Sequence, residues 1–372
     1  MVTSTTLKQT RRPTANPSLT RKERLCGVLL GTAVGDSLGL PAEGLSPTRA
    51  KKLFGGEWRQ RLVLGRGMVS DDTEHTVFVA QSLLAHPNSP ELFARRLGWC
   101  LRGWLLSLPA GIGFATLRAI LRLWVGFRPT RSGVFSAGNG PAMRSAPLGA
   151  FFASSPETLN DYVRRATLLT HTDPKALVGA KAVAYLTAWC LRESPGEAPE
   201  LETLLSLLRS AADGDKDWLE LVNAIAQAHE RDVSVAEFAR NLGLEKGVTG
   251  YIYHTVPVAV YAWLRHFGDF KGTLTAVLDC GGDTDTVGAI VGALQGAVVG
   301  EGGIPDEWTQ RLVDWPRGRV LLSRIGNRLA DHENSDEPMG PVGYFWPAVF
   351  VRNLVFLAVV LFHGLRRLAP PY

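Results

Sequence analysis

The chain has 372 residues, of which 45 % are hydrophobic and 20 % are charged, a balance that excludes a disordered chain. The net charge of +5 lies entirely in the first 24 residues, because the remainder holds 34 basic and 34 acidic residues. Without a basic surface on the folded part, binding to nucleic acid is disfavoured. The cysteines form no CxxC pair, which argues against disulfides or a zinc site and favours a reducing, cytoplasmic location. They are Cys26, Cys100, Cys190 and Cys280.

The N-terminal residues 1–24 are basic and contain two prolines, but they lack the apolar stretch of a secretory signal. We expect a disordered arm here, ahead of a single domain over 25–335. The charge of this arm suits electrostatic docking, and a tail without a specific partner is the plainer alternative.

From Leu25 onward, apolar residues recur at three- and four-residue spacing, the pattern of helices packed on a core. Capping signals such as Asp173-Pro174 precede several of these segments, and alternating strand patterns are scarce. The sequence therefore predicts an all-α fold, a compact single-domain orthogonal helix bundle. The expected helices cover residues 73–85, 91–107, 159–170, 174–193, 200–212, 216–230, 254–267, 285–300 and 317–331.

Two segments carry a glycine at every fourth position. On a helix this spacing leaves a stripe without side chains, which lets another backbone approach closely. Each helical glycine costs about 1 kcal/mol relative to alanine, and we expect close packing of two central helices to offset that cost. The stripes are Gly27, Gly31, Gly35 and Gly39, and Gly288, Gly292, Gly296 and Gly300.

The C-terminal segment 336–372 is predicted to form an apolar helix or tail. Residues 354–362 are uninterruptedly apolar, and Arg352 and Arg366 lie close to either end. Three alternatives remain open: a buried or subunit-interface helix, a helix lying on a membrane surface, and a membrane-spanning helix. A membrane surface, contacted peripherally through this tail, is thus one of the possible partners.

Acidic residues cluster where apolar helices begin or end. Helix capping would need only one carboxylate in each place. If the clusters meet in the fold, their charges repel unless protons or a cation neutralise them. Hydroxyl and carboxylate oxygens without a Cys/His pattern favour Mg²⁺, Mn²⁺ or Ca²⁺ over Zn²⁺. The clusters are Asp36 with Glu43, Asp71 with Asp72, and Asp283 with Asp285.

Two further segments have the character of a binding site. The glycine-rich turn 138–144 could present backbone N–H groups to phosphates, and an ordinary turn is the alternative. In the polar loop before Pro174, Asp173 reads as a helix cap, which leaves His171 with either a structural or a functional role.

Taken in chain order, these motifs resemble the ADP-ribosylglycohydrolase family over about residues 25–302. The matching pieces are GTAVGDSLG at 31–39 with Glu43, SDDT at 70–73, GNGPAMR at 138–144, HTDP at 171–174 and GGDTDTVGAIVGALQG at 281–296. The resemblance implies an all-α domain around a central binuclear Mg²⁺ site, with Mn²⁺ as the other candidate. The C-terminal tail 338–372 lies outside it.

The resemblance also implies roles for individual residues. Glu43 and Asp285 are the expected catalytic residues, with Glu43 as the general base. The expected metal ligands are Ser70, Asp71, Asp72, Asp283, Asp285 and Thr286, and the expected substrate-binding residues are Asp36, Gly138, Asn139, Gly140, Met143 and His171.

The implied reaction is hydrolysis of the glycosidic bond between ADP-ribose and an acceptor, through an oxocarbenium-like transition state. The acceptor is an ADP-ribosylated protein or a small ADP-ribose conjugate, and these motifs specify neither the linkage nor the oligomeric state. Two other functions stay open: a catalytically silent ADP-ribose-binding scaffold, and a two-metal nucleotide phosphoesterase.

Overall fold

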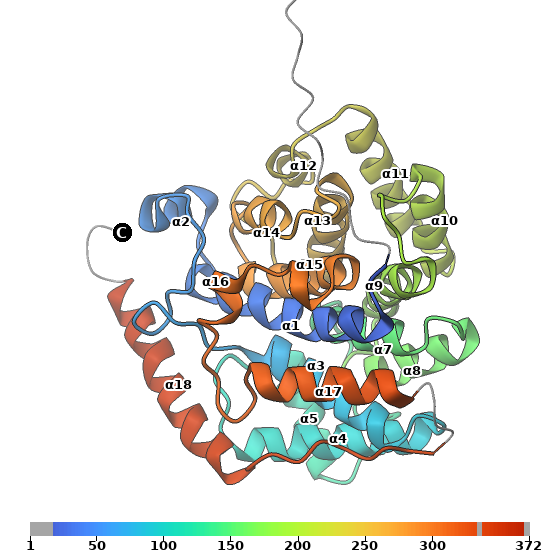
Figure 1. Cartoon of the computed structure of the whole chain (residues 1–372), viewed down its shortest axis with the longest axis vertical. Helices are drawn as coiled ribbons and strands as arrows, with labels where there is room; N and C mark the ends of the chain where they lie inside the picture. The colour runs from blue at the N-terminus through green and yellow to red at the C-terminus, as the bar shows by residue number, and fades with distance from the viewer. Residues whose placement is uncertain (1–17, 333–336, 368–372) are drawn as a thin grey trace, which may run out of the picture.

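The computed structural model describes residues 18–332 and 337–367. In those ranges the secondary structure is helical, with only isolated β-bridges and no named strand. The prediction of an all-α fold in one compact domain is confirmed. Two central helices, α1 (Arg21–Gly39) and α15 (Thr284–Val299), lie side by side, and the other helices surround them (Figure 1).

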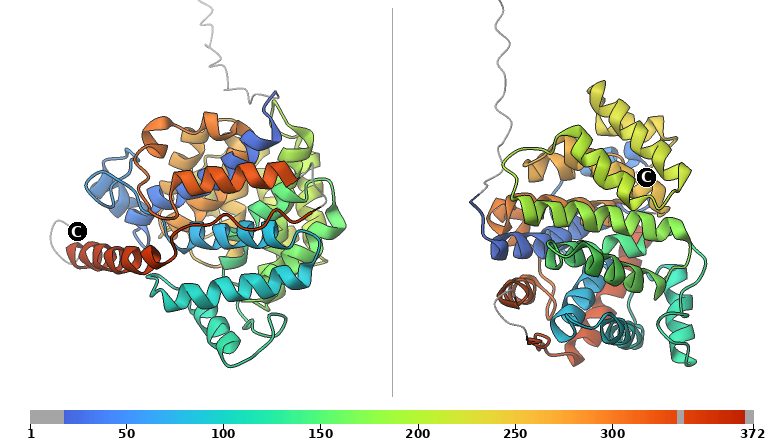
Figure 2. Two further views of the ribbon diagram at one scale, coloured as in Figure 1. Left: turned by 60° about the horizontal axis from the view of Figure 1, so that its bottom comes forward. Right: turned by 90° about the vertical axis from the view of Figure 1, so that its right-hand side faces the viewer.

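The surrounding helices form a shell around this central pair, visible from two further directions in Figure 2. They are η1 (Leu40–Ala42), α2 (Pro47–Phe54), α3 (Asp71–Ala85), α4 (Pro90–Leu106), α5 (Phe114–Trp124), α6 (Gly140–Met143), α7 (Ala146–Phe151), α8 (Pro156–Leu168), α9 (Pro174–Glu193), α10 (Leu201–Ala211), α11 (Lys216–Glu230), α12 (Val235–Asn241), α13 (Ile252–Arg265), α14 (Phe270–Leu278), η2 (Glu301–Gly303), α16 (Asp306–Thr309), α17 (Arg319–Asp331) and α18 (Pro347–Arg366).

Every helix expected from periodicity is present, with ends shifted by a few residues. The apolar spacing did not predict several short helices. Among them are α2 with 8 residues, α5 with 11, α12 with 7 and α14 with 9. Helices this short show few repeats of an apolar pattern, and packing against neighbours stabilises them more than their own propensity does.

The start of α1 corrects the predicted arm. Thr20 and Glu23 form a reciprocal capping box, with Glu23 N donating to Thr20 Oγ1 at 3.2 Å and Thr20 N donating to Glu23 Oε2 at 2.7 Å. Arg24 is fully buried and donates to the Ala297 carbonyl at 2.8 Å. Residues 21–24 thus belong to the core helix, because the capping box and this buried guanidinium hold them there. Of the rest of the predicted arm, residues 18–20 precede this helix and include its cap, and 1–17 lie outside the described residues.

The glycine stripes bring the backbones of α1 and α15 into contact, as predicted. A Cβ added to Gly31 would overlap the carbonyl oxygen of Gly292, and one added to Gly35 would overlap that of Gly288. Gly27 faces Gly296 in the same way, so the two helices run antiparallel. The last predicted member of the second stripe differs: Gly300 ends α15 with a φ of 68°, outside the helix.

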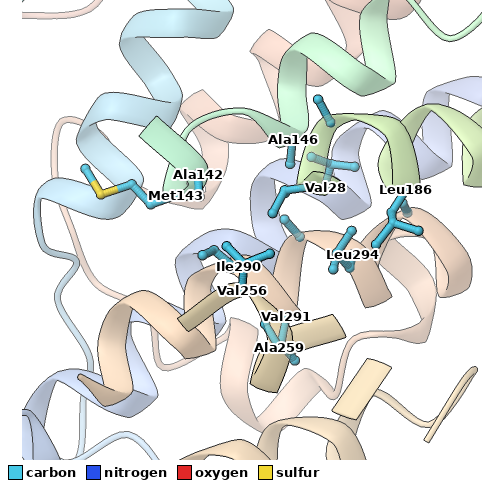
Figure 3. Packing of buried hydrophobic residues seen from close by; sticks show 14 of the residues in the cluster. Val28, Ala142, Met143, Ala146, Leu186, Val256, Ala259, Ile290, Val291 and Leu294 are labelled. Atoms are coloured by element: carbon cyan, nitrogen blue, oxygen red, sulfur yellow. The ribbon is translucent and has the colours of Figure 1, made fainter. Parts of the chain in front are cut away.

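Apolar side chains fill the space beside this contact. Figure 3 shows Val28 of α1 near Ile290 and Leu294 of α15, with Val256 of α13 in the same buried cluster. Met143 belongs to this core and also lines the cavity described below. The packed core therefore supports one wall of the candidate site.

Among the residues that the structure describes, two helices are long and apolar enough to cross a membrane by length and composition. The segment Arg21–Ala42, which contains α1, is fully buried and belongs to the core. The other is α18, which is only 28 % buried and runs along one edge of the molecule (Figure 1). An apolar C-terminal helix was expected, but the structure places it on the surface rather than in the core.

Candidate active site

A cavity of about 330 Å³ lies at the N-terminal ends of α3 and α15. Most of the predicted site residues line it, although they come from five separate stretches of the sequence. Three others, Asp36, Ser70 and Asp72, are buried behind its wall. The lining members are Glu43, Asp71, Gly138, Asn139, Gly140, Met143, His171, Asp283, Asp285 and Thr286.

The start of α3 places the first pair of carboxylates. Ser70 caps the helix, its Oγ accepting from Asp72 N at 3.3 Å. Asp71 and Asp72 therefore occupy the first turn, where the helix dipole favours negative charge. Asp71 lines the cavity, whereas Asp72 is buried and accepts hydrogen bonds from Ser70 Oγ at 3.0 Å and Thr286 Oγ1 at 3.3 Å. This last contact joins α3 to α15.

Asp36 of α1 holds the start of α3 in place. Its carboxylate accepts hydrogen bonds from Ser70 N at 2.9 Å, from Thr73 N at 3.2 Å and from Thr73 Oγ1 at 2.5 Å. Burial raises the pKa of Asp36 to about 7, although these hydrogen bonds oppose the rise. The resemblance implied contact with substrate, but the side chain is fully buried and does not line the cavity, so its observed role is to position α3.

The second pair of acids follows a tightly interlocked glycine loop. Gly282 N donates to the Leu45 carbonyl at 2.7 Å, and Asp283 N donates to the Val248 carbonyl at 2.8 Å. Gly282 has a φ of 84°, and a Cβ there would overlap the Val248 carbonyl, so only glycine fits. The loop places Asp283 at the cap of α15 and Asp285 in its first turn, and it anchors the segment that follows Glu43.

Placing these carboxylates close together is electrostatically unfavourable when all of them are ionised. Burial, followed by repulsion from neighbouring acids, raises the pKa values of Asp71, Asp72 and Asp285 well above those of ordinary aspartates. Asp72 Oδ1 and Asp285 Oδ1 are buried, and neither has a hydrogen-bond partner in the described part of the chain. Buried carboxylate oxygens in this condition need a proton or a cation.

The glycine turn of 138–140 allows close approach of His171. A Cβ on Gly138 would lie 3.0 Å from His171 Nε2, and one on Gly140 would lie 3.2 Å from Cε1. Burial and the Arg144 guanidinium lower the pKa of His171 to about 3, so its ring is neutral at physiological pH. The ring Nδ1 pairs with Thr170 Oγ1 at 2.8 Å. His171 is thus a neutral polar group in the cavity wall.

Asn139 connects this turn to the second carboxylate pair. Its Nδ2 donates to Asp283 Oδ2 at 2.6 Å and to Thr255 Oγ1 at 3.0 Å. Its backbone N donates to the Gly250 carbonyl at 3.0 Å. Asn139 therefore orients the Asp283 carboxylate from within the motif that was predicted to bind substrate.

The structure adds lining residues that the sequence reasoning missed. Most of them come from the end of the α4–α5 connection and the first turn of α5, whose first residue, Phe114, is 75 % exposed. The only sequence signal was the Gly111-Ile-Gly113 turn between two apolar segments, too common a pattern to single out. The additional lining residues are Gly111, Gly113, Phe114, Ala115, Thr116, Ser136 and Gly250.

Glu43 stands at the exposed rim of the cavity, directly after η1. The surrounding protein raises the pKa of its carboxyl by desolvation, Asp283 raises it further, and Arg367 lowers it. Arg367 also donates to the backbone carbonyl of Glu43 at 2.8 Å. The end of α18 therefore contacts the segment that carries the predicted base.

Comparison with known proteins agrees with this geometry. Residues 17–338 match the ADP-ribosylglycohydrolase family. The chain belongs to that family. It is 35 % identical to an uncharacterized protein of Archaeoglobus fulgidus over 83 % of this chain and 96 % of the relative. It is 28 % identical to ADP-ribosyl-[dinitrogen reductase] glycohydrolase of Rhodospirillum rubrum over the same shares.

More distant relatives and a solved structure place the chain in the same family. Identity to ADP-ribosylhydrolase ARH3 of Gallus gallus is 27 %, over 77 % of this chain and 88 % of that protein. A solved structure described as an ADP-ribosylglycohydrolase-related protein complex aligns with a TM-score of 0.57 and 29 % identity, covering 83 % of this chain and 98 % of that one. As a member of this family, the protein is a hydrolase of glycosidic bonds to ADP-ribose.

The residues of this ADP-ribosylglycohydrolase fit a hard divalent cation. The carboxylates are accompanied by the hydroxyl oxygens of Ser70 and Thr286, and two buried carboxylate oxygens lack a hydrogen-bond partner within the described ranges. Within 18–332 and 337–367, no three His, Cys, Asp or Glu side chains stand close enough to form a closed metal cage. Mg²⁺ commonly binds through one or two carboxylates and keeps several waters, so an open arrangement suits it.

Proposed function

We propose that this ADP-ribosylglycohydrolase releases ADP-ribose from an ADP-ribosylated protein or a small ADP-ribose conjugate in a reaction that depends on Mg²⁺. The observation that carries the proposal is the pair of buried oxygens without partners, Asp72 Oδ1 and Asp285 Oδ1, beside a cavity lined by further acids. A divalent cation would satisfy both oxygens and offset the repulsion that raises their pKa values.

The proposed cofactors are two Mg²⁺ ions, with Mn²⁺ as the alternative. When bound, they would supply positive charge that orients ribose hydroxyls and a water molecule. The groups that would hold them are Ser70, Asp71, Asp72, Asp283, Asp285 and Thr286.

Residues at the rim of the cavity and residues in its wall would have different roles in the reaction. Glu43 Oε would accept a proton from the attacking water, and the raised pKa of this carboxyl makes it a stronger base than an ordinary glutamate. The Gly138–Gly140 turn and the neutral His171 ring, which also line the cavity, would contact the substrate. A cavity of about 330 Å³ is of a size that holds part of a dinucleotide-like ligand.

The test is product identity on three substrates: ADP-ribosyl-arginine, ADP-ribosyl-serine and O-acetyl-ADP-ribose, each with Mg²⁺ and with chelator. We expect intact ADP-ribose from at least one substrate, and only with Mg²⁺. Release of phosphate would favour the phosphoesterase alternative. Calorimetric binding of ADP-ribose without turnover on any substrate would favour the silent scaffold.

The metal ligands are tested separately from turnover. Mg²⁺ should raise the Tm of the wild-type protein, and Asp285→Asn should lose this shift together with activity. Glu220→Gln, which neutralises an exposed acid on α11, serves as the matched control and should keep both. An unchanged Mg²⁺ shift in Asp285→Asn would contradict the assignment of Asp285 as a ligand.

A further inference from the structure

Three polar residues of α18, Arg352, Asn353 and His363, face the protein. Arg352 Nε donates to Asp314 Oδ1 at 2.8 Å, and Asn353 Nδ2 donates to the Ser107 carbonyl at 2.9 Å. Three turns later, His363 Nε2 pairs with the Leu62 carbonyl at 2.8 Å. These bonds attach one side of the helix to the body along most of its length.

The opposite side of α18 is apolar and exposed. The outward face is defined by Val351, Val355, Leu357, Leu361, Phe362 and Leu365, and its most exposed members, Phe362 and Leu365, are 66 % and 67 % accessible. A helix on the surface of a globular protein normally shows the reverse arrangement, with apolar residues inward and polar residues outward. An apolar face of this kind marks a surface that contacts something apolar.

The width of the outward face distinguishes a flat apolar medium from a partner helix. At 100° per residue, its six members spread over roughly 160° of the helix circumference. A two-helix seam uses a narrower stripe at heptad positions a and d. The arrangement therefore fits a helix half immersed in a lipid surface better than a helix paired with a second copy.

The buried polar side excludes a spanning helix. A spanning α18 would have to leave the body and carry Arg352 and Asn353 into hydrocarbon, where their hydrogen bonds to Asp314 and Ser107 would be lost. If α18 keeps these hydrogen bonds to the body, it can contact a membrane only by lying along the membrane surface.

The exposed arginine at one end of α18 and the aromatic rings at the other match an anionic bilayer. The helix contains no acidic residue, and the exposed Arg366 lies in its last turn. Exposed Phe345 and Trp346 precede it, at 62 % and 49 % accessibility, and Trp favours the headgroup region. We infer that the outward face of α18 docks this enzyme flat on an anionic lipid bilayer. This helix lies beyond residue 338, outside the match to the family.

The experiment is flotation of the full-length protein with vesicles of phosphatidylcholine alone and of phosphatidylcholine mixed with phosphatidylserine. We expect binding to the mixed vesicles that weakens as salt is added. Leu361→Glu should lower the partition coefficient at least about tenfold, because it places a charge in the immersed face. Val320→Glu, an equally drastic change at a 72 % exposed position on α17, should bind like the wild type.

Both variants change exposed side chains, so their Tm values should stay close to wild type and report that the protein is folded. Light scattering on the same samples measures the oligomeric state. Failure of the wild-type protein to bind mixed vesicles, or equal binding by Leu361→Glu, would overturn the inference. A wild-type dimer that Leu361→Glu converts to a monomer, without vesicle binding, would instead assign the face to a second copy.

Discussion

The guanidinium of Arg367 donates to the backbone carbonyl of Glu43 at 2.8 Å, although the two residues are 324 positions apart in the chain. Its second nitrogen donates to the Pro41 carbonyl at 2.7 Å. The end of α18 thus clamps the short segment that carries the proposed base. This helix lies outside the region shared with the family, so here a peripheral element restrains the proposed catalytic machinery.

Arg367→Ala should lower kcat about tenfold and change KM less, because the Glu43 segment becomes free to move its carboxylate away from the attacking water. The acid limb of the rate profile should move to higher pH, since Arg367 lowers the pKa of Glu43. Steady-state kinetics across pH measures both effects. The adjacent exposed substitution Arg366→Ala is the control and should leave both unchanged.

A double-mutant cycle separates this positioning role from a general loss of stability. If Arg367 acts through Glu43, adding Arg367→Ala to Glu43→Gln should lower kcat no further. Full additivity of the two losses would show that Arg367 acts elsewhere.

Asn139→Ala should weaken Mg²⁺ binding by about 10- to 100-fold, as is typical when a residue that orients a metal ligand is removed. The reason is the 2.6 Å hydrogen bond through which Asn139 Nδ2 holds Asp283 Oδ2. The measurements are the Mg²⁺ dependence of activity and the Mg²⁺-induced change in Tm. Asn223→Ala, at an exposed position on α11, should match the wild type. An unaltered Mg²⁺ dependence in Asn139→Ala would contradict the orienting role.

Gly31→Ala should destabilise the protein by at least about 3 kcal/mol or prevent folding, because the new Cβ meets the carbonyl of Gly292 and two backbones would have to separate. Gly103→Ala provides the matched comparison on α4, since nothing lies within 4 Å of a Cβ there. That change should be neutral or stabilising by up to about 1 kcal/mol. Denaturant unfolding and soluble yield compare the two variants, and similar stabilities would refute close contact of α1 with α15.

The pH dependence of stability should include a contribution from His171. Its pKa is lowered to about 3 in the folded protein, whereas the unfolded chain titrates near 6.5, so the unfolded state gains the proton first as pH falls. Stability from this group is present above the unfolded pKa and should decrease by about 2 kcal/mol between pH 7 and pH 5. In His171→Gln the decrease should be smaller by that amount, and in the exposed His229→Gln it should persist. Parallel pH curves for wild type and His171→Gln would show that His171 is not buried in its neutral form.

Much of the fold followed from local pattern. The three- and four-residue spacing of apolar side chains located helices such as α9. A glycine at every fourth position in two segments predicted the close pairing of α1 with α15. The acidic motifs at 70–73 and 281–286 predicted a gathering of charge at two helix starts, since capping requires far fewer carboxylates. These features depend on neighbours along the chain, so the sequence by itself determined them.

Tertiary structure decided which side of each element faces inward. The same acidic motifs contain Asp71, which lines the cavity, and Asp72, which is buried behind it, while Asp36 turns away to hold α3. From the sequence alone, Arg24 was assigned to a solvated arm, but in the fold it is buried against α15. Arg352 and Asn353 of α18 face inward because they bind Asp314 and Ser107. The physical reason is that burial depends on partners between 34 and 273 positions away, which no local spacing encodes.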